Sequence, residues 1–191
     1  MRKNHLFNAV SIIGAAIYLP LAAHAVTAAA DESWQTPAIP GYGKIHVVGA
    51  QDRTYAPSQH ITAKLLFEIT QPAATAQQLD PALEKVARSI NLYVADGVPL
   101  DHLDCVVMLG SDAVSLALDD QHYRARFGSA NPNLDLLSRL RAAGVKIVVS
   151  AQALADRHVD ESAVTAQAGV TLSATTAVAA LKQNGYSMMP L

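Results

Sequence analysis

From residue 60 onward, short apolar runs alternate with segments in which apolar residues recur at the spacing of a helix. The run at 63–69 predicts a strand, and the run at 103–109 (LDCVVML) is apolar enough to be buried on both faces, as central parallel strands are. A further buried strand is expected at 145–149, and shorter strands are expected at 170–172 and 186–189. The pattern therefore predicts a sheet of about five strands.

Apolar residues at helical spacing fill the gaps between these strands. One helix is expected to begin after Asp80, which can cap it, and to stop at Asp96-Gly97. Asn131 is expected to cap another helix that ends at Gly144, and 119–130 is interpreted as a polar excursion. Shorter helices are expected near Ala113, from Ala153 to about His158, and from Thr175 or Thr176 to Lys182.

This alternation of strands and helices indicates an α/β fold. It calls for a mainly parallel central sheet with helices on both faces. In open sheets of this kind, ligands bind beyond the carboxyl ends of the strands. Those ends are therefore the first place to search for a site.

The first 25 residues have the pattern of a secretory signal peptide. A positively charged start (MRK) precedes an almost wholly apolar run at 6–23, and an A-x-A signal ends at Ala25, with a second possible cut after Ala30. An uncleaved membrane anchor is the alternative, but Pro20 and two polar residues interrupt the run. We therefore expect a periplasmic or secreted protein that has no membrane span after cleavage.

Composition narrows the classes of partner. The chain of 191 residues has a formal net charge of −2, and loss of the two positive charges of the signal would make it more acidic. Such a chain has no electrostatic reason to bind nucleic acid or anionic lipid. Cys105 is its single cysteine, so no intramolecular disulfide can form, and stability depends on an aliphatic core.

Three segments follow from these patterns: a signal peptide at 1–25, an extended N-terminal arm at 26–59 and a folded domain at 60–191. The arm is polar and rich in proline and glycine, and 44–48 is compatible with a short edge strand. We expect the rest of the arm either to lie along the domain or to reach a neighbouring subunit.

Several kinds of chemistry find no support in the sequence. Neither a glycine-rich dinucleotide motif nor a phosphate-binding loop is present, and neither Ser111 nor Ser150 lies in a G-x-S-x-G motif. The densest polar cluster, His102 with Asp101 and Asp104, precedes a strand at the opposite edge from the expected site. The histidines of the mature chain lack metal-binding spacing, so we expect no metal and no cofactor.

Polar residues do gather where two predicted strands end. Gly110, Ser111 and Asp112 follow one strand, and Ser150 and Gln152 follow the next. This cluster is suited to hydrogen-bonding a small ligand. Ordinary helix capping explains Ser111, Asp112 and Ser150 equally well, whereas Gln152 is less easily explained that way.

Cys105 lies within a buried strand, where apolar surroundings raise the pKa of a thiol and leave it inert. A small core residue is therefore the favoured interpretation of Cys105, and a reactive thiol is the alternative.

A series of motifs runs through the domain in a specific order and spacing: Ile90-Asn91-Leu92-Tyr93, Gly97-Val98, Asn131-Pro132-Asn133-Leu134 with Leu137, Ala143-Gly144-Val145-Lys146-Ile147, Gln152-Ala153-Leu154, Gly169-Val170-Thr171-Leu172-Ser173-Ala174 and Asn184-Gly185-Tyr186-Ser187-Met188-Met189-Pro190. In these motifs the domain resembles the DsrE/DsrF-like family of sulfur-relay proteins, from about Ala63 to Leu191. The resemblance implies a three-layer αβα domain, a homo-oligomer that is commonly a trimer or hexamer, and a role in handling sulfur, in which some members carry a persulfide on a cysteine.

The chain departs from the family pattern at two chemically active positions. The family often has a cysteine two residues before the glutamine matched by Gln152, and this chain has Ser150 there. A histidine often precedes the glycine matched by Gly110, and here Leu109 takes that place. Because a serine hydroxyl cannot hold a persulfide as a thiolate can, the fold carries over more safely than the activity.

These observations lead to a main hypothesis and two alternatives. The main hypothesis is an exported DsrE-like oligomer that binds a small ligand or a partner without covalent sulfur transfer, at Gly110, Ser150 and Gln152, with Ser111 and Asp112 beside them. The first alternative is a sulfurtransferase or persulfide carrier that uses Cys105. The second is a structural subunit that pairs with a catalytic, sulfur-handling relative. Asn91, on a helix face, and Asn131, as a cap, are expected to have local structural roles.

Overall fold

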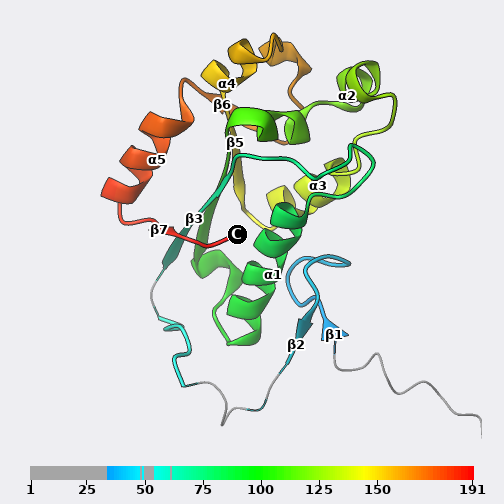
Figure 1. The fold of residues 1–191 in the computed structure, drawn as a ribbon. Coiled ribbons are helices and arrows are strands. Elements are labelled where there is room, and N and C mark those ends of the chain that lie inside the picture. Colours follow the sequence, from blue (N-terminus) through cyan, green and yellow to red (C-terminus); the bar gives the residue numbers. More distant parts are fainter. Residues whose placement is uncertain (1–33, 48, 50–53, 61) are drawn as a thin grey trace, which may run out of the picture. The chain divides into compact units, whose positions relative to one another are not determined.

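The structure is a computed structural model that describes residues 34–47, 49, 54–60 and 62–191 (Figure 1). The chain divides into two units, and all described residues belong to the second, Asp31–Leu191. The predicted signal peptide and both of its possible cleavage sites lie outside the described residues. Within the described part, no helix is long and apolar enough to cross a membrane.

The second unit is built on a five-stranded sheet in the order β6-β5-β4-β3-β7, and every neighbouring pair is parallel. All five predicted strands are present, three of them with ends shifted by one residue. This confirms the predicted fold class. The strands are β3 (Ala63–Ile69), β4 (Leu103–Leu109), β5 (Lys146–Ser150), β6 (Gly169–Thr171) and β7 (Ser187–Met188).

Helices connect the strands in the expected places. The first begins as predicted, because the Asp80 carboxylate accepts hydrogen bonds from the N–H groups of Ala82 and Leu83. The helices are α1 (Pro81–Ala95), α2 (Asp120–Phe127), α3 (Leu134–Ala142), α4 (Ala151–Asp156) and α5 (Ala174–Gln183). Short 3-10 helices lie at Leu100–His102 (η2), Ser111–Ala117 (η3) and Glu161–Ala163 (η4).

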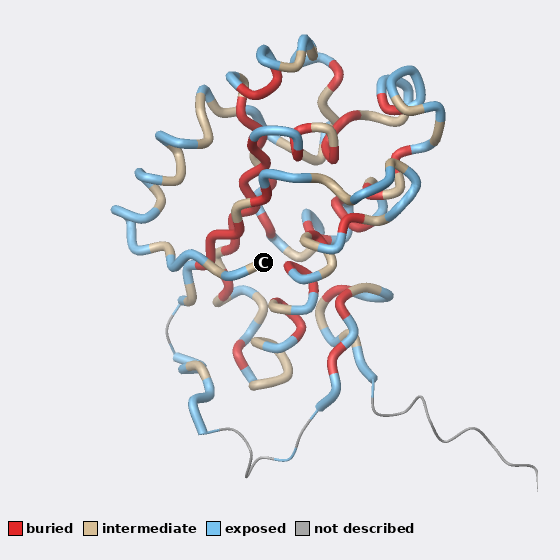
Figure 2. Tube along the Cα trace, viewed as in Figure 1, coloured by how far each residue is buried: buried red, intermediate tan, exposed pale blue. Residues whose placement is uncertain are grey.

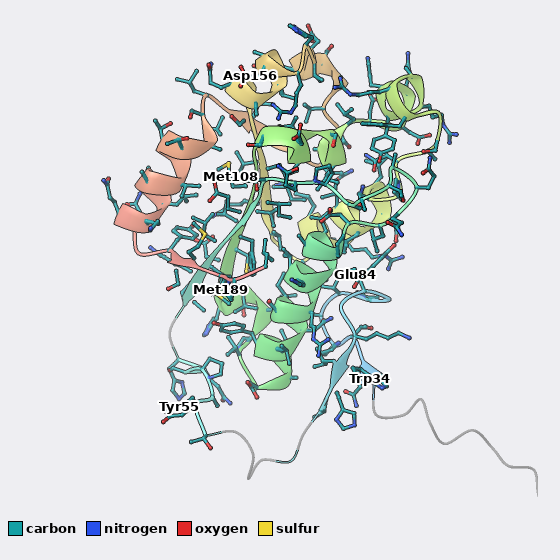
Figure 3. All side chains as sticks on the ribbon, in the orientation of Figure 1. Trp34, Tyr55, Glu84, Met108, Asp156 and Met189 are labelled. Carbon is teal, nitrogen blue, oxygen red and sulfur yellow. The ribbon has the colours of Figure 1, made fainter. Side chains whose placement is uncertain are left out.

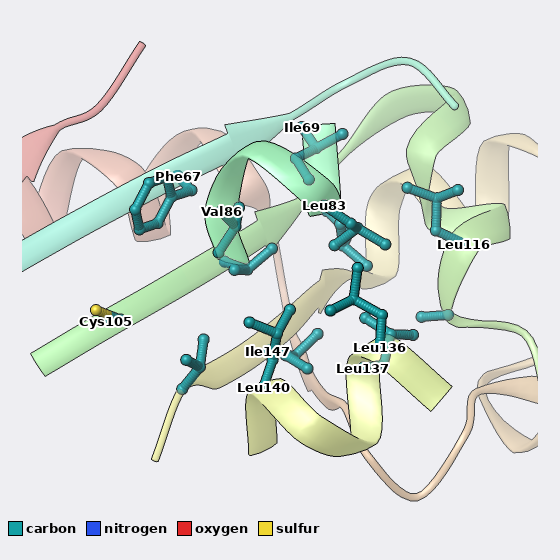
Figure 4. Packing of buried hydrophobic residues seen from close by; sticks show 14 of the residues in the cluster. Phe67, Ile69, Leu83, Val86, Cys105, Leu116, Leu136, Leu137, Leu140 and Ile147 are labelled. Carbon is teal, nitrogen blue, oxygen red and sulfur yellow. The ribbon is translucent and has the colours of Figure 1, made fainter. Parts of the chain in front are cut away.

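The sheet has a hydrophobic layer on each face, and one layer contains many more buried residues than the other. Alternate side chains of β3, β4 and β5 point to one face, where α1, α3 and η3 pack against them and form the main core (Figure 4). The other face buries Leu66, Val106 and Met108 under α5 alone. In Figure 2, burial follows the central strands, while α5 has no fully buried residue. The arrangement is the three-layer αβα that the resemblance implied.

The interpretation of 119–130 as a polar excursion is wrong, because this segment contains α2. Within α2, Tyr123 alone is buried, so the sequence shows no apolar stripe from which a helix could be recognised. The helix is defined by its ends instead. The Asp119 carboxylate accepts a hydrogen bond from the N–H of His122, and Gly128 closes the helix in the left-handed conformation, at φ 73°.

Asn131 does not cap α3, contrary to the prediction. The helix begins at Leu134, and Asn133 holds the cap position. The amide of Asn131 donates instead to the carbonyl oxygens of Leu116 and Leu118, at 3.0 and 2.7 Å. The side chain therefore connects the end of η3 to the segment just before α3. A buried side-chain amide needs hydrogen-bond partners, and the carbonyl groups of η3 and its C-terminal neighbour supply them.

The arm lies along the domain in the described part of the chain. Its strands β1 (Trp34–Gln35) and β2 (Ile45–His46) form an antiparallel pair outside the main sheet, so the strand expected at 44–48 is present but shorter. The buried side chain of Asn91 on α1 holds the turn between these strands. It accepts from the N–H groups of Ala38 and Ile39 and donates to the carbonyls of Tyr42 and Gly43, all within 2.8–2.9 Å.

Candidate functional site

A pocket of about 220 Å³ opens at the carboxyl ends of β3, β4 and β5. Four of the five predicted site residues line it: Gly110, Ser111, Ser150 and Gln152. They meet because parallel strands end at the same edge of the sheet. We call this the strand-end pocket, and its other lining residues are Glu68, Thr70, Ala153, Asp156, Arg157, Ser173, Ala174 and Thr175.

Ser150 lies at the junction of two helices. Its side chain is buried, and its Oγ accepts hydrogen bonds from the N–H groups of Ala153 and Ala174, both at 3.3 Å. Ala153 belongs to the first turn of α4 and Ala174 is the first residue of α5. The capping role considered for Ser150 is therefore present, and it serves two helix starts at the pocket wall.

Ser111 has a backbone conformation that side chains rarely adopt, with φ at 48°. It is the first residue of η3, directly after β4, and its neighbours are fixed by the sheet. The N–H of Gly110 donates to the carbonyl of Ile69 at 3.0 Å, and that of Ala113 to the carbonyl of Thr70 at 3.3 Å. A left-handed non-glycine residue costs about 1 kcal/mol, and such strain tends to occur at functional sites.

Asp112 lies next to the strand-end pocket but does not line it. Its Oδ1 accepts a hydrogen bond of 2.6 Å from Nε of Arg157, and this contact lowers the pKa of the carboxyl. Arg157 lines the strand-end pocket and also an adjoining hollow of about 200 Å³, which Asp112 lines with Arg126 and Phe127. Asp112 therefore positions Arg157 and does not itself line the pocket.

Sequence reasoning missed the charged members of the pocket, although two signals were available. Glu68 interrupts the apolar strand LLFEI one residue before its end. Asp156 stands four residues after Gln152 in α4, a spacing that places both side chains on the same helix face. With Arg157, these residues give the pocket two carboxylates and one guanidinium.

A sequence model of the DsrE/DsrF-like family matches residues 63–191. The chain belongs to the DsrE/DsrF-like family. A search of curated proteins gives no match.

The solved structures that are similar to this DsrE-family chain include two with closely matching statistics. The protein of unknown function MTH1491 from Methanobacterium thermoautotrophicum is 15% identical with a TM-score of 0.46, over 66% of this chain and 97% of that one. The ychN protein from E. coli is 17% identical with a TM-score of 0.46, over 66% of this chain and 96% of that one.

The DsrE-family domain holds its thiol away from the strand-end pocket. Cys105 is 2% exposed and lies near the start of β4, in the core beneath α1, opposite Leu65 of β3 (Figure 4). Burial, and to a lesser extent the carboxylate of Asp104, raise the pKa of the thiol to about 12. At neutral pH the thiol is therefore protonated and shielded, which disfavours a nucleophilic role.

The cluster of Asp101, His102 and Asp104 does not form a site. Asp104 accepts hydrogen bonds from Nζ of Lys146 at 2.8 Å and from the hydroxyl of Tyr186 at 2.7 Å. His102 places Nδ1 3.1 Å from the carbonyl oxygen of Gln59, on the arm. Among the described residues, no three His, Cys, Asp or Glu side chains are grouped closely enough to hold a metal ion.

Proposed function

We propose that this DsrE-family protein binds a small polar ligand non-covalently in the strand-end pocket. The observation that carries the proposal is the hydroxyl of Ser150. It stands where the family pattern often has a cysteine, it is buried at the pocket wall, and two backbone N–H groups donate to it. A hydroxyl in this place can bind and orient a ligand but cannot carry a sulfane sulfur.

The size and the charges of the pocket support one class of ligand. A volume of about 220 Å³ is below the range of about 300–1,000 Å³ that is typical of sites for larger organic molecules. Glu68 and Asp156 offer carboxylates to an amine, and the guanidinium of Arg157 can face a carboxylate. We propose a zwitterion of amino-acid size, and sulfur-containing amino acids are the first candidates in view of the family.

Export and self-assembly complete the proposal. The charged start, apolar run and A-x-A signal of residues 1–25 support export to the periplasm or beyond. Family membership supports a homo-oligomer, which we propose to be a trimer or hexamer. A sulfur-handling partner remains part of the proposal, and isolation of the native complex from the periplasm would distinguish a self-assembling homomer from a subunit that pairs with a catalytic relative.

Thermal-shift titration tests the ligand. Cysteine, methionine, serine and thiosulfate would be titrated against the unmodified protein, Gln152→Ala and the control Gln121→Ala, which changes an exposed glutamine on α2 outside the pocket. We expect an amino acid to raise the melting temperature of the unmodified protein and of Gln121→Ala, and to raise that of Gln152→Ala much less. Equal shifts in all three proteins, or no shift with any compound, would count against the pocket.

A further inference from the structure

A separate hollow, of about 570 Å³, lies between the arm and α1. It exists because Asn91 holds the turn of the arm against the helix, and because Gly43 has no side chain. A Cβ on Gly43 would collide with the backbone of Ala87 and Arg88. Figure 3 labels Trp34 on the arm and Glu84 on α1, and both line this hollow, which we call the arm pocket.

Three cations converge on the arm pocket. Lys44 comes from the arm, and Lys85 and Arg88 come from adjacent turns of α1. None of the three has an ion-pair partner among the described residues, whereas four other lysine or arginine residues do: Arg124, Arg139, Lys146 and Arg157.

Among the described residues that line the arm pocket, Glu84 has the one carboxylate, and this group already accepts a hydrogen bond. Its Oε2 accepts a hydrogen bond of 2.7 Å from the N–H of Gly43. The described part of the wall therefore presents more positive than negative charge, which attracts an anion.

Trp34 adds an aromatic platform to this charge. Trp34 is 44% exposed, although large apolar residues are usually buried. His46 holds it edge-on, with ring centroids 5.7 Å apart and planes at 78°. An exposed indole beside several cations is suited to a ligand that has both an aromatic ring and a negative charge.

We propose that the arm pocket binds a small organic anion that carries an aromatic ring. Lys44, Lys85 and Arg88 hold the charged group, and Trp34 stacks against the ring. No phosphate-binding loop is needed for this mode of binding, because side chains and not a glycine-rich backbone supply the positive charge. The site is separate from the strand-end pocket and does not depend on the function proposed there.

The chain offers a direct probe, because Trp34 is its single tryptophan and its fluorescence therefore reports on this pocket. The full chain would be titrated with adenosine monophosphate, with adenosine as a ring without charge, and with inorganic phosphate as a charge without a ring. We expect saturable quenching by the monophosphate and binding at least about tenfold weaker for each of the other two.

Two variants distinguish loss of charge in the arm pocket from a general effect of removing a surface cation. Lys85→Gln/Arg88→Gln removes two cations from the exposed side of α1 and is expected to weaken binding of the monophosphate by about tenfold or more. Lys182→Gln, on the exposed side of α5 outside the pocket, should bind as the unmodified protein does. Quenching that rises linearly without saturation, equal affinity in the double variant, or phosphate binding as tightly as the monophosphate would each overturn the proposal.

Discussion

Asn91 accepts a hydrogen bond of 2.9 Å from the N–H of Ile39, a residue 52 positions earlier in the chain. The same side chain makes three further hydrogen bonds to the arm, and Asn91 is fully buried.

We expect Asn91→Ala to lower the free energy of unfolding by about 3 kcal/mol, because buried backbone groups lose their partners. Urea unfolding measures this change, and the arm should also become sensitive to protease. Gln183→Ala, at an exposed position on α5, should change the stability by less than about 0.5 kcal/mol. An unchanged urea midpoint in Asn91→Ala would contradict the anchoring role.

Cys105 should be inert in the folded protein. With a pKa of about 12 and 2% exposure, it should resist iodoacetamide until the chain is denatured, and mass spectrometry can count the adducts. Treatment of the folded protein with inorganic polysulfide, which supplies sulfane sulfur, should leave Cys105 without a persulfide. Detection of a labelled sulfane sulfur on the native chain, and its transfer to an acceptor, would restore the sulfur-carrier alternative.

Ser150→Cys should create a reactive thiol. The N–H groups of Ala153 and Ala174 that donate to Oγ would stabilise a thiolate in the same place, and the position lines a pocket. We expect alkylation of the native variant at least about tenfold faster than that of Cys105, which serves as the reference within the same molecule. If residue 150 labels as slowly as Cys105, the strand-end pocket does not admit small reagents.

Asp104 should contribute stability that depends on pH. Partial burial works against its charge, but hydrogen bonds from Lys146 and Tyr186 outweigh burial and hold the pKa of the carboxyl below its ordinary 3.8. Because the pKa is lower in the folded state, this stability is present above pH 3.8 and is lost as the pH falls through the folded value. Asp104→Asn should therefore be less stable than the unmodified protein by about 1 kcal/mol at neutral pH. Below the folded-state pKa of Asp104, the two proteins should be nearly equal in stability. A difference that stays constant across this range would show that the charge is not involved.

Ser111→Gly should stabilise the protein. Glycine adopts a φ of 48° without the clash that a Cβ causes, and this gain exceeds the entropy that glycine costs. We expect an increase of about 0.5 kcal/mol in the free energy of unfolding. Ser111→Ala keeps the Cβ and should show no such gain, so a comparable increase in both variants would assign the effect to the lost hydroxyl.

The sheet and the position of the strand-end pocket follow from the sequence for clear physical reasons. Strands such as 103–109 must be continuously apolar because both of their faces are covered, and this leaves a pattern that can be recognised. Parallel strands also end at one edge, so Gly110 and Ser150 had to be near each other once the strands were assigned. The acidic cap of α1 is equally local, because Asp80 contacts residues two and three positions away.

Features that depend on distant contacts left no such pattern. Asn91 looks like any polar residue on a helix, and its partners lie between 48 and 53 positions away. The two sides of the arm pocket meet through that contact, so the convergence of Lys44 with Lys85 could not be predicted from spacing. The helix α2 was missed for a different reason, since it buries Tyr123 alone and is stabilised by its two ends.

The outer strands of the sheet are much shorter than its centre. β6 has three residues and β7 has two, whereas β3 and β4 have seven each. Each border therefore offers few unpaired backbone groups to a strand from another molecule, which protects an aliphatic protein against aggregation by sheet extension. If copies of this chain associate, we expect them to do so through side chains on their helices and loops and not by continuing the sheet.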